Sequence, residues 1–123
     1  MNEQQQNEAL KDLAEWGCDI QGALSRLLNS RDFYFRLLPS VLTEPSFDAL
    51  NAALERKDVS GAFESAHTLK GVLGNLGLTP MYQEACGAVE LLRAGTLEGV
   101  GAHYEALDRQ RSFLKDVLER TAR

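Results

Sequence analysis

The sequence predicts an all-α protein: an antiparallel four-helix bundle with additional short helices at its N-terminus. Apolar residues recur at helical spacing along most of the chain, and the alternation that marks strands is scarce. Only three prolines interrupt the 123 residues, and the sequence contains no repeats or low-complexity stretches. The links between the periodic segments are short enough to connect antiparallel neighbours in a bundle.

A short helical arm is predicted over residues 1–17. The first residues are polar, and Leu10, Leu13 and Trp16 then follow at three-residue steps until Gly17. A glycine directly after the last periodic residue is typical of a helix end. We therefore expect the chain to leave the arm at this glycine.

Two further short helices are expected before the bundle. Asp19 and Ser30 belong to the residue types that cap helix N-termini, and each precedes an apolar segment with helical spacing. Pro39 lies inside the second of these segments, where it removes a backbone donor and disfavours helical geometry in the residue before it. We expect a kink or break near Leu38.

The core bundle is predicted over residues 45–121, about two thirds of the chain. Pro45 is suited to the first turn of the first bundle helix, where its missing amide costs nothing. Asp58 or Ser60 can cap the second helix, which should run to Gly77.

The third helix of the bundle has clear limits, and the last has one unusual residue. Thr79 is expected to be the N-cap of the third helix, with Pro80 at its first helical position and Gly95 as its stop. Arg111 interrupts the apolar stripe of the last helix. That helix can therefore project past the bundle.

Composition and charge restrict the kinds of partner. With 44% hydrophobic and 25% charged residues, the chain is typical of one soluble domain, residues 1–123. The net charge of −5 argues against nucleic acid or an anionic membrane as the main partner. The sequence contains no apolar run long enough to span a membrane, and its polar first residues do not predict a signal peptide, so a cytoplasmic location is expected. Cys18 and Cys86 are expected to be reduced thiols in or near the core.

The helix over residues 60–77 has a clear inner and outer side. Each residue of an α-helix turns by about 100° from the one before it. This rotation gathers five apolar residues into one stripe that must face the core. His67 points about 140° away from the centre of that stripe, so it is predicted to face solvent. The stripe consists of Ala62, Ala66, Leu69, Leu73 and Leu76.

Two glycines and two apolar residues lie near the direction of His67. Glycine inside a helix costs about 1 kcal/mol relative to alanine, so two on an exposed face indicate open space for a partner's backbone or a phosphate. The apolar pair, with Glu64 on the flank one turn before, would form a docking surface, although the phenylalanine can instead tuck into the core. All four fall within about 40° of the histidine on the helical projection: Gly71, Gly74, Phe63 and Leu78.

His67 has the chemistry of a phosphoacceptor. A neutral imidazole is nucleophilic at cellular pH, and a ring nitrogen bonded to phosphorus forms a phosphoramidate that remains a good donor. Lys70, one turn along, can balance the charge of the phosphoryl oxygens, unless it is a solvated lysine paired with Glu64. Without such neighbours His67 would be an ordinary surface histidine, as we expect for His103.

The run around His67 carries a resemblance to a known family. It reads His67-Thr68-Leu69-Lys70-Gly71-Val72-Leu73-Gly74-Asn75-Leu76-Gly77-Leu78. This run resembles the H-x-L-K-G-x-x-x-N-[IL]-G motif of histidine-containing phosphotransfer (HPt) domains, and the similarity to bacterial single-domain members extends from residue 17 to residue 120. The resemblance implies that His67 is phosphorylated, in the middle of one helix of an antiparallel four-helix bundle. Lys70 and Gly71 would then provide charge and access.

The same resemblance implies a phosphorelay intermediate. Such a protein passes a phosphoryl group between the receiver-domain aspartates of a hybrid sensor kinase and a response regulator, as a phosphocarrier and not as an enzyme. The chain lacks a glycine-rich nucleotide motif and is too short for a kinase. No cofactor and no metal site are expected in the chain itself, so Mg²⁺ should come from the receiver. We expect a monomer. The alternative is a docking module that regulates a partner by binding alone.

Overall fold

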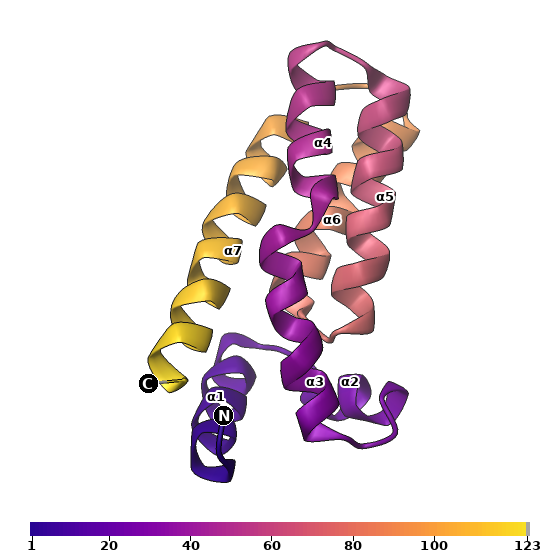
Figure 1. The fold of residues 1–123 in the computed structure, drawn as a ribbon. Helices are drawn as coiled ribbons and strands as arrows, with labels where there is room; N and C mark the ends of the chain where they lie inside the picture. Colours follow the sequence, from indigo (N-terminus) through magenta and orange to yellow (C-terminus); the bar gives the residue numbers. More distant parts are fainter. Residues whose placement is uncertain (123) are drawn as a thin grey trace.

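The computed structural model describes residues 1–122 (Figure 1). These residues form seven α-helices and one 3₁₀ helix and contain no strand, which confirms the predicted all-α fold. Within them, no helix is long and apolar enough to cross a membrane. The elements are α1 (Glu3–Trp16), α2 (Ile20–Arg26), α3 (Arg31–Leu37), the 3₁₀ helix η1 (Leu38–Thr43), α4 (Pro45–Glu55), α5 (Val59–Asn75), α6 (Thr79–Arg93) and α7 (Val100–Thr121).

Helices α4 to α7 run antiparallel in chain order and form a four-helix bundle (Figure 1). Helix α5 packs against α4 and α6, and α7 closes the bundle against α6 and α4. Removal of apolar surface from water is the main force that holds the four helices together. Large side chains from all four are fully buried between them: Phe47, Leu50, Leu69, Leu73, Met81, Leu107 and Leu114.

Asp58 and Gly77 determine the two ends of α5. The Asp58 carboxylate accepts a hydrogen bond from the Gly61 amide at 3.0 Å, so Asp58 and not Ser60 is the N-cap. At the other end, Gly77 adopts a φ of +67°, and its amide donates to the Gly74 carbonyl at 3.1 Å. This left-handed residue turns the chain sharply into α6.

Helix α6 begins one residue earlier than the sequence indicates. Its N-cap is Leu78 and not Thr79, so Pro80 occupies the second helical position. The Leu78 side chain is fully buried, which anchors the cap in the core. The Thr79 hydroxyl donates instead to the Gly77 carbonyl at 3.4 Å. The helix ends before Gly95, as predicted.

The short helices before the bundle follow the predicted caps. Asp19 and Ser30 accept hydrogen bonds from backbone amides at the starts of α2 and α3. Helix α3 stops directly before Leu38, and the chain continues through Pro39 as a 3₁₀ turn, so the predicted break is confirmed. The missing proline donor is tolerated there because the tighter helix begins at this point.

The first helix is longer than its apolar steps indicate. It begins at Glu3, because the side chains of Asn2 and Gln5 each accept a hydrogen bond from the other's backbone amide at 2.8 Å. It ends where predicted, at Gly17 with a φ of +106°. This capping box extends the helix toward the N-terminus beyond the part that the apolar pattern predicts.

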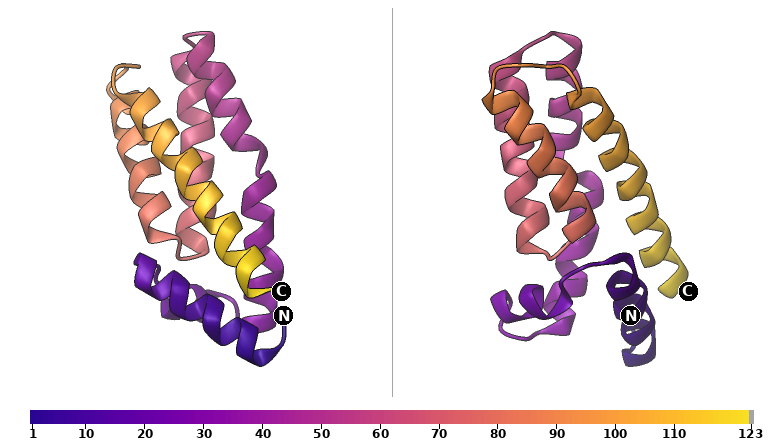
Figure 2. Two further views of the ribbon diagram at one scale, coloured as in Figure 1. Left: turned by 90° about the vertical axis from the view of Figure 1, so that its left-hand side faces the viewer. Right: turned by 180° about the vertical axis from the view of Figure 1, so that it is seen from behind.

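The C-terminal end of α7 extends past the adjacent ends of α5 and α6, as the sequence predicts, but it is not left uncovered (Figure 1). Helix α1 and η1 pack against it (Figure 2), and Leu114, Val117 and Leu118 are buried. Arg111 is accommodated because its guanidinium lies 4.3 Å from the centroid of the Phe47 ring. The N-terminal helices therefore lengthen the core of the bundle.

Candidate functional site

His67 faces solvent on the outer side of α5, as the helical projection predicts. Its side chain is exposed, whereas all five residues of the predicted stripe are buried. Within residues 1–122, the imidazole has no hydrogen bond and no ion pair, and its ring contact is with Phe63. An unpaired imidazole on a rigid helix is available to a reaction partner.

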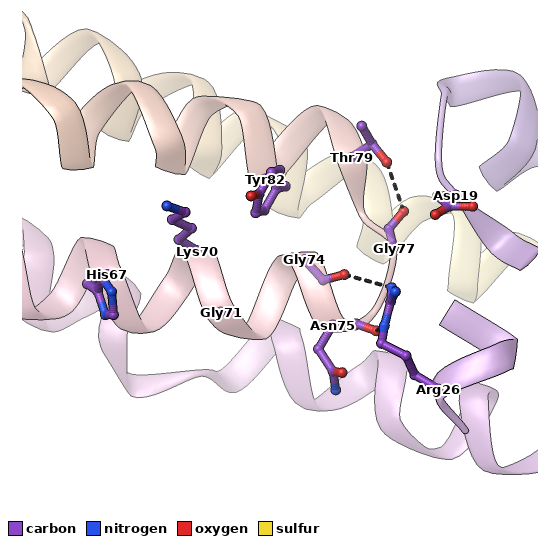
Figure 3. A pocket seen from close by; sticks show the side chains of 10 residues that line it. All are labelled: Asp19, Arg26, His67, Lys70, Gly71, Gly74, Asn75, Gly77, Thr79 and Tyr82. Carbon is purple, nitrogen blue, oxygen red and sulfur yellow. Dashed lines mark hydrogen bonds between the residues drawn. The ribbon is translucent and has the colours of Figure 1, made fainter. Parts of the chain in front are cut away.

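A groove of about 600 Å³ runs along α5 beside His67 (Figure 3). Helix α5 forms one wall, α6 forms the opposite wall, and the segment around α2 closes the far end. The fold therefore gathers three separate parts of the sequence at this surface. The lining residues are His67, Lys70, Gly71, Gly74 and Asn75 of α5, Gly77 of the turn, Thr79 and Tyr82 of α6, and Asp19 and Arg26 around α2.

Phe63 lies beside His67 and also packs against the core. The two ring centroids are 5.8 Å apart with an interplanar angle of 25°, and the phenyl ring is half-buried. The guanidinium of Arg93, from α6, lies 5.6 Å from the centroid of the same ring. Phe63 thus contacts both the imidazole and a cation of α6. Sequence reasoning missed Arg93, because no spacing within α5 indicates what α6 places beside it.

Lys70 extends from α5 toward α6, next to Tyr82 (Figure 3). It is half-buried, and no carboxylate in residues 1–122 forms an ion pair with it. The alternative in which Glu64 neutralises this lysine is therefore wrong. Glu64 is exposed, and its backbone carbonyl accepts a hydrogen bond from the Thr68 hydroxyl at 3.0 Å. The groove next to His67 keeps a positive charge available.

Gly71 and Gly74 differ in what their missing side chains permit. A Cβ atom on Gly71 would meet nothing within 4 Å, so this position leaves the surface beside His67 open. A Cβ atom on Gly74 would lie 2.9 Å from the Tyr82 ring. The structure therefore leaves open space at Gly71 and not at Gly74, and the approach of a partner at Gly71 stays a prediction. Gly74 instead lets Tyr82 pack against α5.

Leu78 does not lie on this surface. It is 0% exposed, which contradicts its assignment to a docking surface. The assignment extended the rotation of α5 by three residues beyond Asn75, where the helix ends. The left-handed turn at Gly77 directs the next side chain into the core instead. The same turn places Tyr82, which the sequence analysis did not single out, on the groove wall.

Arg26 is the second functional candidate that sequence reasoning missed. Its Nε and Nη2 atoms donate to the carbonyls of Asn75 and Gly74, at 3.0 and 2.9 Å (Figure 3). A cation at the C-terminus of a helix interacts favourably with the helix dipole. Arg26 is 48 and 49 residues away from these acceptors in the sequence, so no local pattern could have indicated the contact.

His103 and the cysteines lie outside the groove. His103 is half-buried, with its Nδ1 atom 2.7 Å from Glu84 Oε2, and a Cβ atom on Gly87 would collide with its ring. It therefore links α7 to α6 and is not an ordinary surface residue. Within residues 1–122, no group of three or more acidic, cysteine or histidine side chains is placed to hold a metal ion. Cys18 and Cys86 are free thiols, and burial raises the pKa of Cys18 to about 12.

Comparison with known proteins agrees with this geometry. The family model described as "Hpt domain" matches residues 43–122, which include the four bundle helices and the outer face of α5. Comparisons with curated proteins and with solved structures found no significant match. The family match covers more than half of the chain. The chain therefore belongs to the Hpt domain family, whose members are phosphocarriers that act in phosphorelays through receiver domains and are not kinases.

Proposed function

We propose that the chain carries a phosphoryl group on His67 between the receiver-domain aspartates of a hybrid sensor kinase and a response regulator. The observation that carries the proposal is the exposed, unpaired imidazole of His67 beside an open groove. The groove supplies Lys70 as a cation and, at Gly71, space for the receiver to approach.

The transfer exchanges one bond to phosphorus for another. The unprotonated ring nitrogen of His67 attacks the phosphorus of the receiver's aspartyl phosphate. A P–N bond forms as the P–O bond to the aspartate breaks, and the aspartate leaves as a carboxylate. Phe63 contacts the attacking ring, and in-line attack depends on how that ring is oriented. Lys70 offsets negative charge on the phosphoryl oxygens. Transfer to the next receiver is the reverse of this step.

We further propose that the receiver supplies Mg²⁺. Phosphoryl transfer depends mainly on positioning and charge neutralisation, which a metal at the acceptor aspartate provides. Glu64 is the carboxylate expected on the outer face of α5, and one carboxylate usually needs further ligands to hold Mg²⁺. The chain would then act as a monomer that binds one receiver at a time, without any ATP-dependent activity of its own.

The deciding experiment follows labelled phosphate from a phosphorylated receiver to the purified chain. We expect acid-labile label on the wild-type chain, with transfer that stops when a chelator removes Mg²⁺. Labelled ATP without a kinase should leave the chain unlabelled. Receiver binding without any transfer would support the alternative of a docking module that acts by occupancy. Undiminished transfer in chelator would show that the receiver's metal is not required.

A further inference from the structure

The groove beside His67 includes residues that lie before the family match. Asp19 and Arg26 line its far end, although the match begins only at residue 43. Figure 3 shows Arg26 reaching up to the last carbonyls of α5, and Asp19 beside the turn at Gly77. The surface that faces a receiver is therefore larger than the helical hairpin that carries the family motif.

Asp19, Arg26 and the segment around them form the N-terminal wall of the groove, and hydrogen bonds attach this wall to α5. The Asp19 amide donates to the Gly77 carbonyl at 2.8 Å. The Tyr34 hydroxyl, which is buried, donates to the Leu76 carbonyl at 2.8 Å. With the two Arg26 hydrogen bonds, these contacts occupy the carbonyls of four successive residues, from Gly74 to Gly77. The wall is therefore in place before a partner arrives, and binding does not have to order it.

Arg26 retains binding capacity after it has capped α5. A guanidinium has five N–H donors in a planar fork, and the helix-end carbonyls use two of them. The side chain remains exposed. Together with Lys70 it places two cations along a groove whose lining includes one carboxylate, Asp19, in a chain whose net charge is −5. A receiver presents carboxylates around its acceptor aspartate, so its charge complements this groove.

Leu28 provides an independent indication, two residues beyond Arg26. It is 92% exposed and has a φ of +57°, a left-handed conformation that a leucine rarely adopts. Such a conformation costs about 1–2 kcal/mol. The side chain does not compensate for this cost by burial within the chain. The backbone conformation itself belongs to the turn that ends α2, where the Asn29 amide donates to the Leu24 carbonyl at 2.7 Å. The indication of a partner is therefore the large apolar side chain that this turn leaves exposed.

We infer that Arg26 and Leu28 form a second contact region for the receiver domain, at the end of the groove away from His67, and that this region selects which receiver exchanges phosphate with the chain. The inference rests on the proposed function. The motif face of α5 provides the chemistry, and the α2 segment provides an ionic and an apolar contact. A receiver that reaches His67 lies along the groove and meets Arg26 at its far end.

The first test reverses the charge of Arg26. Arg26→Glu is compared with Arg109→Glu, which makes the same charge change at an exposed position of α7 that does not line the groove. We expect kcat/KM for transfer from the receiver to fall about tenfold for Arg26→Glu through a higher KM, which corresponds to a loss of about 1.4 kcal/mol. Arg109→Glu should change kcat/KM by less than about twofold.

A small phosphodonor separates this inference from the proposed function. Phosphoramidate can phosphorylate His67 without docking, and both variants should accept label from it at the wild-type rate. A wild-type chain that accepts label from phosphoramidate but from no receiver would contradict the proposed function. Wild-type transfer that Arg26→Glu leaves unchanged would overturn only the second contact region.

The second test uses Leu28→Gly, because Arg26→Glu can also weaken the cap of α5. Glycine adopts the left-handed conformation without strain, so the variant should have a higher Tm than the wild type. Its KM for the receiver should nevertheless rise about threefold or more, as expected for a lost apolar contact. A purely structural residue could not raise stability and weaken transfer together. A raised Tm with an unchanged KM would refute the role of Leu28.

Discussion

His67 and His103 are the two histidines of the chain, and their surroundings are opposite. His67 lies exposed beside an open groove, without a hydrogen bond within the described residues. His103 is half-buried and paired with Glu84 at 2.7 Å, over a glycine that leaves room for its ring. A satisfied side chain stabilises the fold, whereas an unsatisfied one on a rigid helix is free to react. The comparison shows that the hydrogen-bond partners within the fold, and not the residue type, distinguish a structural histidine from one that is free to react.

The largest effects are expected when each histidine is replaced in turn by glutamine. His67→Gln should remove acid-labile phosphorylation completely while the Tm stays within about 2 °C, because the exposed ring contributes little to stability. His103→Gln should retain phosphorylation but lose about 1–2 kcal/mol of unfolding free energy. Label measurements and urea unfolding on both variants provide the check. Label that persists in His67→Gln would place the phosphoacceptor elsewhere.

Gly71 and Gly74 allow the same comparison within the groove, because one borders open space and the other is covered by the Tyr82 ring. Gly71→Leu should leave the bundle folded and gain up to about 1 kcal/mol of helix stability, yet transfer should fall at least tenfold because the new side chain occupies the approach to His67. Gly74→Leu should instead destabilise the fold by about 1–3 kcal/mol, since it meets the Tyr82 ring. Transfer kinetics and urea unfolding distinguish the two outcomes. Equal behaviour of the variants would contradict our account of the groove.

Gly87 provides the corresponding test on the packed side. Gly87→Ala should displace the His103 ring and destabilise the chain by about 1–3 kcal/mol. The exposed Gly101, on α7, serves as control: a Cβ there meets nothing within 4 Å, so Gly101→Ala should stabilise the helix. Urea midpoints report both changes. Phosphotransfer should remain at the wild-type rate in each variant.

Lys70→Ala should have a smaller effect on the reaction. A flexible, half-exposed lysine offers limited stabilisation of charge, so transfer should slow by about two- to fivefold while the fold is unchanged. Glu64→Ala serves as the control on the same face and should have less effect still. Single-turnover rates at two ionic strengths provide the measurement. A rate that is unaffected by Lys70→Ala would remove this lysine from the mechanism.

The smallest effect concerns Cys18. Burial raises the pKa of this thiol from 9.0 to about 12, so above pH 9 the unfolded chain releases a proton that the folded chain retains. The resulting contribution to stability is complete at pH 8 and is lost progressively as the pH rises above 9. Urea midpoints between pH 8 and 9.5 should decline less in Cys18→Ala than in the wild type. An identical decline would mean that Cys18 does not cause it.

Local patterns determined much of this structure in advance. The caps at Asp19, Ser30 and Asp58 and the break at Pro39 follow from single residues and their neighbours. These features depend on backbone donors and acceptors within one turn, which a sequence displays directly. The orientation of His67 follows equally from the regular rotation of one helix. The local prediction failed at Leu78, where that rotation was carried past the end of the helix.

By itself, the sequence determined the four-helix bundle, the outward direction of His67 and the family motif, because helix caps and helical rotation act over a few residues. Only the tertiary structure decided what surrounds that histidine. It placed Arg93 over Phe63, packed Tyr82 against Gly74 and brought Arg26 to the end of α5. These contacts join residues from different helices, and the packing that sets them depends on the volumes of all the buried side chains together. The reactive group could therefore be predicted from the sequence, whereas the surface around it could not.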